Sequence, residues 1–338
     1  MFLMITYAWK FFVNRSDVVF EEKHLCNESA NLSDMRAVTT TYLLCVFVGS
    51  LSVLIMCGNL LLITSIVYFK QLHTPTNYLI LSLAVADLLV GVLVLPFSTI
   101  LSVSSCFYLQ DSLCKVRGSF DIFLCTSSIL NLCFISVDRY YAVCQPLRYK
   151  AKINVRVIMI MILVSWTVPA LNGISVTVLG VNQEQTNKGC VLFQNVKFAI
   201  IGAGFGFFLP GLIMSMIYLK ILVVAQRQAR SIQNNISFGI KPGATVSKME
   251  RKATKTLAIV MGIFLICWTP FFLCMTFNPL SGYTIPVAVI AAFKWLGWSN
   301  SMLNPFVYAF FYSWFRSAFR MIISGKIFQG NFTNCKLF

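Results

Sequence analysis

Asp121 is an acidic residue inside an apolar stretch that runs from about residue 114 to residue 143. A carboxylate in a hydrocarbon environment is costly and is retained mainly where it meets a partner. We therefore interpret Asp121 as the anchor for the ammonium group of a ligand. The alternative is a buried structural acid that is bonded to nearby hydroxyl groups.

Aromatic residues at helical spacing could enclose the apolar part of such a ligand, because the faces of Trp and Phe attract cations and bury other rings. These residues are Trp268, Phe271, Phe272 and Trp295. An ordinary apolar core has the same pattern, and that interpretation stays open. Ile122 and Cys125 lie on or near the Asp121 face of the predicted helix, so we expect them to line the floor of the site.

Lys294 and Trp298 are one helical turn apart and share a face of their predicted helix. The ordinary explanation for Lys294 is that its side chain snorkels to the outer water layer. The alternatives are a resting salt bridge to Asp121 or a binding point for the carboxylate of a zwitterionic ligand. The indole of Trp298 can donate but not accept a hydrogen bond. Both residues belong to the predicted ligand site.

The elements that must position these residues are apolar segments long enough to cross a membrane, since about 20 mostly apolar residues suffice. Hydrophobic residues make up 58% of the 338 residues and charged residues only 11%. The segments cover residues 40–68, 76–104, 114–143, 154–178, 196–225, 254–277 and 284–310. The sequence thus predicts an all-α membrane protein, a seven-helix bundle spanning residues 40–310.

The distribution of basic residues predicts the orientation, because Lys and Arg accumulate on the cytoplasmic side. The faces that follow the first, third, fifth and seventh segments are rich in Lys and Arg, with Asp138 and Glu250 as their acidic residues. We therefore expect residues 1–39 to form an extracellular tail of a plasma-membrane protein. Anionic lipid explains the net charge of +16 better than nucleic acid does.

Four cysteines fall on the predicted outer side, where disulfides are permitted. Cys114 with Cys190 would join the second outer loop to the third segment, and the remaining pair, Cys26 with Cys106, is a less supported second bond. The outer tail also matches the glycan-acceptor motif. The acceptors would be Asn14, Asn27 and Asn31.

On the cytoplasmic side, Arg139 can pair with its neighbour Asp138 and, across the bundle, with Glu250. Release of Arg139 while the sixth segment swings outward would be a two-state switch. We assign Tyr140, Asn304, Pro305 and Tyr308 to the same predicted switch. The alternative is a solvated charge at a basic helix end. Residues 315–323 predict a short amphipathic eighth helix along the inner leaflet, within an expected cytoplasmic region of residues 311–338.

Motifs in seven successive segments resemble the rhodopsin-like G-protein-coupled receptors. They are Gly58-Asn59, the run Leu83 to Asp87, Asp138-Arg139-Tyr140, Trp166, Pro210, the run Cys267 to Pro270, and the run Asn304-Pro305-Phe306-Val307-Tyr308. Longer stretches, such as residues 69–77, 138–150, 250–262 and 300–315, are similar to the trace amine-associated receptors. The resemblance implies a small amine ligand whose ammonium group pairs with the Asp121 carboxylate. It also implies a partner, a heterotrimeric G protein of the stimulatory type, through which the receptor raises cyclic AMP.

A polar set from the second, third and seventh segments resembles the sodium site of this family. It consists of Asp87, Ser128, Asn300, Ser301 and Asn304. Oxygen ligands suit a hard cation, so an allosteric sodium ion is one interpretation and a hydrogen-bonded water network is the other. We expect no other cofactor.

The sequence departs from the amine-receptor pattern in the fifth segment, where Gly202 and Gly206 stand at positions that commonly carry hydroxyls or a second carboxylate. A ligand hydroxyl or a diamine would lack a partner there, which favours an aromatic primary monoamine. An amino-acid-like ligand bound through Lys294 is the alternative within receptors. A transporter or channel would show repeated broken helices, and an enzyme would need a nucleophile and base, for which the histidines His24 and His73 are badly placed.

Overall fold

The computed structural model of this protein describes residues 32–103, 107–179, 200, 202–237, 244–282 and 284–325. The chain divides into two compact units, Met1–Phe47 and Val48–Phe338. The described part of the first unit is the beginning of the first long helix. All contacts and sites below lie in the second unit.

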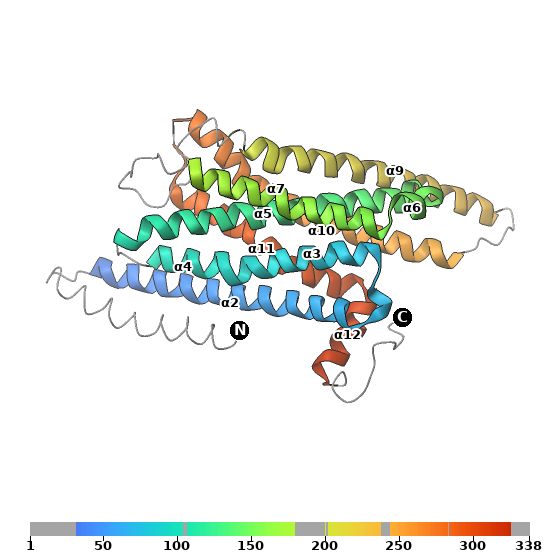
Figure 1. Ribbon diagram of the computed structural model, residues 1–338, viewed down its shortest axis with the longest axis horizontal. Coiled ribbons are helices and arrows are strands. Elements are labelled where there is room, and N and C mark those ends of the chain that lie inside the picture. The colour runs from blue at the N-terminus through green and yellow to red at the C-terminus, as the bar shows by residue number, and fades with distance from the viewer. Residues whose placement is uncertain are drawn as a thin grey trace. The chain divides into compact units, whose positions relative to one another are not determined.

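The described residues form helices and turns and contain no strand (Figure 1). The long helices are α2 (Leu32–Tyr68), α3 (Pro75–Leu89), α5 (Phe107–Cys144), α7 (Val155–Leu179), α9 (Leu209–Ser237), α10 (Ala244–Leu280) and α11 (Val287–Phe311). Shorter elements are η1 (Lys70–Leu72), η2 (Val90–Val94), α4 (Leu95–Val103), α6 (Pro146–Lys152), η4 (Gly204–Phe208) and α12 (Ser313–Ile323). Each predicted segment is helical, with α3, η2 and α4 together forming the second and η4 with α9 forming most of the fifth.

Six of the helical segments are long and apolar enough to cross a membrane by length and composition. They are Cys45–Tyr68, Pro75–Thr99, Val116–Cys144, Val155–Ser175, Gly204–Arg227 and Ala258–Asn278. The predicted seventh segment is the 25-residue helix α11. Its polar residues, among them Lys294, Asn300 and Asn304, lower its hydropathy, and the first of these belongs to the site described below.

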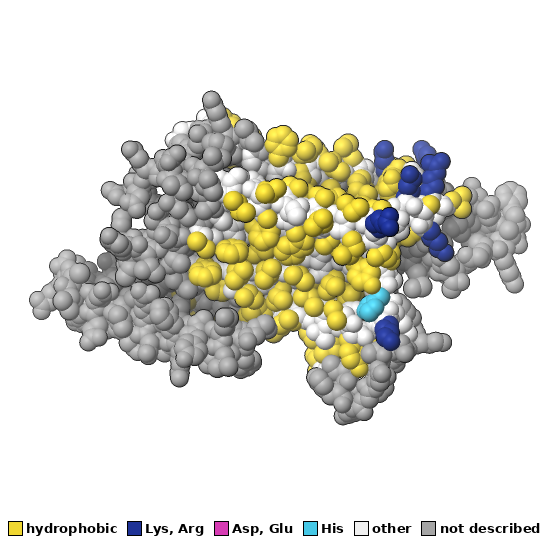
Figure 2. Space-filling view, in the orientation of Figure 1, with side chains coloured by type: hydrophobic (Ala, Val, Ile, Leu, Met, Phe, Trp, Pro, Cys, Tyr) yellow, Lys and Arg dark blue, Asp and Glu magenta, His cyan; other side chains and the backbone are white. Residues whose placement is uncertain are grey.

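The outward surface of the second unit is apolar around the middle of the helices. Figure 2 shows hydrophobic side chains gathered over the centre of this face and Lys and Arg gathered toward one end. Exposed apolar residues include Leu171, Phe205, Ile266 and Phe310, each more than 65% accessible. Side chains of this kind are stable against lipid tails, so the surface fits a membrane environment with basic residues at one boundary.

Two prolines follow π-helical turns, which the sequence did not predict. Pro96 comes two residues after η2, and Pro210 comes two residues after η4. Proline lacks a backbone donor and disturbs the preceding turn, and a π-helical turn is one way to absorb that disturbance. Pro210 therefore stands at the beginning of α9, after a widened turn, whereas Pro305 lies inside α11 as expected.

Polar side chains and small residues join the helices inside the second unit. The indole nitrogen of Trp166 in α7 donates to Ser82 Oγ in α3 at 2.9 Å, and Asn59 Nδ2 in α2 donates to the carbonyl oxygen of Ser301 in α11 at 3.1 Å. A Cβ at Gly58 would lie 3.0 Å from Cβ of Pro305, so α2 and α11 approach closely there. These contacts join α7 to α3 and α2 to α11.

The predicted amphipathic helix forms as α12. It buries Trp314, Phe315 and Ala318 on one side. Arg316 Nη1 donates to the carbonyl oxygens of Ala309 at 3.1 Å and Phe310 at 2.8 Å. These carbonyls belong to the last turn of α11, where a basic side chain satisfies acceptors that have no helical partner.

Candidate functional site

The carboxylate of Asp121 is buried and has a charged partner from another helix. Its residue is only 6% exposed. Oδ2 lies 2.6 Å from the Lys294 ammonium of α11, and Oδ1 accepts a hydrogen bond of 2.8 Å from the indole nitrogen of Trp298. The thiol of Cys125, one turn further along α5, also donates to Oδ1 at 3.3 Å. Both oxygens of Asp121 are therefore engaged by the chain itself.

The snorkelling interpretation of Lys294 is wrong for this structure. Its side chain is 20% exposed and its ammonium faces Asp121 instead of the water layer. A buried carboxylate attracts a cation more strongly than a screened one does, because the surrounding dielectric constant is low. The resting salt bridge, one of the two alternatives, is the arrangement that the structure contains.

Aromatic rings surround the ammonium of Lys294. Its nitrogen lies 5.1 Å from the ring centre of Trp298 and 5.8 Å from that of Phe271, within the range of cation–π attraction. Trp295 packs edge-on against Trp298 with ring centres 4.8 Å apart. The structure thus brings the predicted aromatic residues of α11 to the same place as Asp121.

The remaining aromatic residues of the predicted site form a cluster on α10. The Trp268 ring lies 6.0 Å from Phe271 and 5.8 Å from Phe272, centre to centre. Phe272 in turn stacks at 4.3 Å on Phe207 of η4, a buried residue that the sequence analysis missed. Periodicity did not identify Phe207, since it lies in a π-helical turn where helical spacing changes.

A second residue that the sequence analysis missed is Arg117. It precedes Asp121 by one helical turn, and the two charges interact electrostatically. The sequence carried a signal for it, because opposite charges at positions i and i+4 share a helix face. Ile122 is half-buried beside Asp121, and the described contacts of the Asp121 carboxylate do not include it.

Gly202 lies two residues before η4, and Gly206 lies within it. A Cβ added at either position would meet no atom within 4 Å, so a Cβ is accommodated at both. The lack of a polar side chain at these positions is therefore a property of the sequence and is not forced by crowding.

Asp87 is the centre of a second buried polar cluster. Its residue has no exposed surface, and its carboxylate accepts hydrogen bonds from Ser301 Oγ at 2.8 Å, Asn304 Nδ2 at 2.7 Å and Ser128 Oγ at 3.1 Å. The side-chain oxygen of Asn300 is buried and has no hydrogen-bond partner in the structure. Carboxylate and amide oxygens such as these are the kind of ligand that a hard cation accepts.

The Asp138-Arg139 pair forms as expected at the end of α5. Arg139 Nε donates to Asp138 Oδ2 at 2.9 Å, and Asp138 has no exposed surface. The carboxylate also accepts hydrogen bonds of 2.8 Å from Thr76 Oγ1 in α3 and from the Tyr149 hydroxyl in α6, two partners that the sequence analysis missed. Burial, and then the negative charge of Asp138, raises the pKa of Tyr149, so this hydroxyl stays a donor at neutral pH.

The two tyrosines among the predicted switch residues have different surroundings, and the switch itself stays a prediction. The hydroxyl of Tyr140 accepts a long hydrogen bond of 3.5 Å from Gln145 Nε2, and Tyr308 is buried with its hydroxyl unpartnered. The side chain of Glu250 lies outside the described residues, as do those of Cys114, Cys190, Cys26 and Cys106 and the acceptors Asn14, Asn27 and Asn31.

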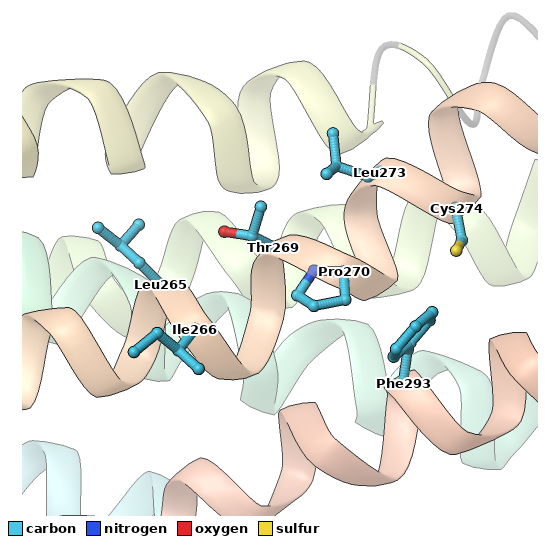
Figure 3. Close-up of a pocket in the computed structure, with 7 residues that line it drawn as sticks. All are labelled: Leu265, Ile266, Thr269, Pro270, Leu273, Cys274 and Phe293. Atoms are coloured by element: carbon cyan, nitrogen blue, oxygen red, sulfur yellow. The ribbon is translucent and has the colours of Figure 1, made fainter.

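An apolar pocket of about 560 Å³ opens on the surface between α10 and α11 (Figure 3). Six of its lining residues come from α10 and the seventh, Phe293, comes from α11. Figure 3 shows the Phe293 ring facing Pro270 across the opening. This pocket has no charged lining residue, so it is separate in its chemistry from the Asp121 site.

Comparison with known proteins identifies the family. Residues 58–308 match the 7 transmembrane receptor (rhodopsin family). The chain is 48% identical over 296 residues to the trace amine-associated receptor 1 of Macaca mulatta, covering 83% of this chain and 87% of that protein. It is 44% identical over 331 residues to the trace amine-associated receptor 1 of Mus musculus, covering 93% of this chain and 99% of that receptor. It is 41% identical over 333 residues to the trace amine-associated receptor 4 of Mus musculus, covering 94% of this chain and 96% of that receptor.

These relatives are receptors and cover most of the chain, so the enzyme interpretation is excluded and the protein is a multi-pass membrane protein. The helices α2 to α11 with the appended α12 agree with that assignment. This chain belongs to the rhodopsin family of seven-transmembrane receptors, within its trace amine-associated branch.

Proposed function

We propose that this protein is a plasma-membrane receptor for small primary amines, with its amino terminus outside the cell, and that it signals through the stimulatory G protein to raise cyclic AMP. The observation that carries the proposal is the buried Asp121 carboxylate, which already binds an ammonium group between aromatic rings. The names of the related receptors support the same ligand class.

The chemistry of the site favours a ligand with one cation and an apolar or aromatic body. Asp121 is the acidic side chain in the described cluster, and it can neutralise one ammonium group. The rings of Trp268, Phe271 and Phe272 offer apolar surface for the rest of the ligand. Gly202 and Gly206 supply no side-chain hydroxyl or carboxylate, so a second polar group on the ligand would gain little there.

Signal transfer would begin at the aromatic cluster and end at Arg139. A ligand that contacts Trp268 can displace the ring cluster of Trp268, Phe272 and Phe207, which joins α10 to η4. A ligand shifts a conformational equilibrium only by its differential affinity for the two states. In the responding state α10 would lean outward, and Arg139 would leave Asp138 and Thr76, to which its guanidinium donates in this structure, and would meet the G protein.

The Asp87 cluster would hold an allosteric sodium ion. Asp87 supplies the charge, while Ser128, Ser301 and the unpartnered oxygen of Asn300 supply neutral ligands. The ion would offset the cost of a carboxylate without exposed surface in the middle of the bundle. Its binding would favour the state in which these helices lie as close as they do in this structure.

The amine proposal is tested with Asp121→Asn, which keeps the shape of the side chain and removes its charge. Cells expressing the wild-type chain or the variant are stimulated with 2-phenylethylamine, and cyclic AMP is measured against dose. Removal of one partner of a buried, hydrogen-bonded charge pair costs about 2–5 kcal/mol of binding, so we expect the half-maximal dose to rise by about thirtyfold or more. An unchanged half-maximal dose at equal surface expression would show that Asp121 is not the anchor.

A second candidate function is recognition of an amine that also carries a carboxylate. The position of the Lys294 ammonium inside the site, 2.6 Å from Asp121, is the observation that favours it. In that case a ligand carboxylate would bind Lys294 while its ammonium binds Asp121. The experiment in the next section separates the two ligand classes.

A further inference from the structure

Side chains of the protein itself contact both oxygens of the anchor carboxylate. Asp121 Oδ2 binds the Lys294 ammonium at 2.6 Å, while Oδ1 is taken by the Trp298 indole at 2.8 Å and the Cys125 thiol at 3.3 Å. An incoming ammonium group therefore finds no free oxygen on Asp121. It must replace one of the donors that are already present.

Lys294 is the donor that an amine can replace. Trp298 and Cys125 are neutral, and Trp298 is 2% exposed and fixed by its packing. Lys294 carries the same ammonium chemistry as a primary amine, contacts the same carboxylate and lies over the same two rings, Phe271 and Trp298. Its side chain has four rotatable methylene groups and is 20% exposed, so it has a route out of the site.

We propose that Lys294 is an internal competitor for the amine ligand, and that ligand binding exchanges one ammonium group for another on Asp121. The proposal rests on the proposed function, because it assumes that Asp121 is the amine anchor. Lys294 thereby sets the potency of simple monoamines. A neutral residue at this position would leave the carboxylate open.

The size of the effect follows from the fraction of receptors in which Lys294 is not bound to Asp121. The apparent dissociation constant equals the intrinsic constant divided by that fraction. If Lys294 occupies Asp121 in about nine of ten unliganded receptors, its removal raises monoamine potency about tenfold. A tightly held pair, as the 2.6 Å distance indicates, gives a larger gain.

The experiment compares three receptors with a matched pair of ligands. Lys294→Met keeps most of the apolar stem and removes the charge, and Lys294→Arg keeps the charge. Wild type and both variants are tested for cyclic AMP against 2-phenylethylamine and against phenylalanine, which is the same amine with an added carboxylate. We expect Lys294→Met to lower the half-maximal dose of 2-phenylethylamine about tenfold or more, Lys294→Arg to stay near wild type, and phenylalanine to gain nothing comparable.

Each other outcome overturns the proposal in a distinct way. An unchanged monoamine dose in Lys294→Met shows that Lys294 does not compete for the anchor. A phenylalanine response in wild type that Lys294→Met abolishes assigns Lys294 to a ligand carboxylate instead. If the variant fails to reach the cell surface, direct binding of 2-phenylethylamine to detergent-purified Lys294→Met and wild type gives the same comparison.

A double variant separates this proposal from the proposed function. In the Asp121→Asn background, Lys294→Met should leave the monoamine response as weak as it is in Asp121→Asn alone. A loss of response in Asp121→Asn with no gain in Lys294→Met refutes only the competitor. A normal response in Asp121→Asn refutes the anchor itself.

Discussion

Gly297 of α11 lies directly against the indole of Trp268, and this contact allows a quantitative prediction. A Cβ at position 297 would lie 2.6 Å from Cε3, 2.7 Å from Cζ3 and 2.9 Å from Cδ2 of that ring. Trp268 is 6% exposed and packs on Phe271 and Phe272, so the rigid ring has little room to move. Gly297→Ala should therefore overpack the aromatic cluster of the proposed ligand site.

The expected cost combines two opposing effects. Insertion of a methyl group into a packed core costs typically about 1–3 kcal/mol. Replacement of a helical glycine by alanine regains roughly 0.5–1 kcal/mol of backbone entropy. The balance of these ranges is roughly 0–2.5 kcal/mol, and we expect Gly297→Ala to lose about 1 kcal/mol of stability.

Thermal unfolding of the purified receptor in detergent measures this loss. The matched control is Gly262→Ala in α10, where an added Cβ meets no atom within 4 Å, so that variant should unfold at or slightly above the wild-type temperature. Gly297→Ala should unfold below both. If Gly297→Ala proved as stable as Gly262→Ala, the close packing of Trp268 against α11 would be refuted.

Two further predictions concern the other clusters. If Asp87 holds sodium, raising the sodium chloride concentration should lower the affinity of wild type for 2-phenylethylamine, whereas the same concentration of potassium chloride should not. The Asp87→Asn variant should not distinguish the two salts. An equal sodium effect in the variant would place the ion elsewhere. Arg316→Gln removes the charged donor to the carbonyls of Ala309 and Phe310, which is worth about 1.5–3 kcal/mol for a buried group and less at this exposed site. Faster amide hydrogen exchange in α12 and the last turn of α11 should follow, and unchanged exchange would show that the cap contributes nothing.

The sequence predicted the helices because hydropathy marks the part of each helix that lies in hydrocarbon. It did not predict how far helices extend into water. α9 continues to Ser237 and α10 begins at Ala244, since a helix satisfies its own backbone hydrogen bonds wherever it lies. The π-helical turns η2 and η4 were also missed, because they depend on how the chain relieves the strain near Pro96 and Pro210.

The buried acids were predictable, whereas their partners were only partly so. Asp121 and Asp87 stand out because a carboxylate is rare in an apolar segment. The choice between snorkelling and a salt bridge for Lys294 depends on how α5 and α11 are rotated against each other, and Asp121 and Trp298 are 177 positions apart in the chain. Thr76 and Tyr149 were missed as partners of Asp138 for the same reason, since helical periodicity describes one helix at a time.

The most direct test of this account is the structure of the receptor with 2-phenylethylamine bound. We expect the ligand nitrogen at about 2.7–2.9 Å from an Asp121 oxygen, the ligand ring against Phe271 or Phe272, and the Lys294 ammonium withdrawn from the carboxylate. A ligand nitrogen bound elsewhere, with the pair of Asp121 and Lys294 intact, would contradict it.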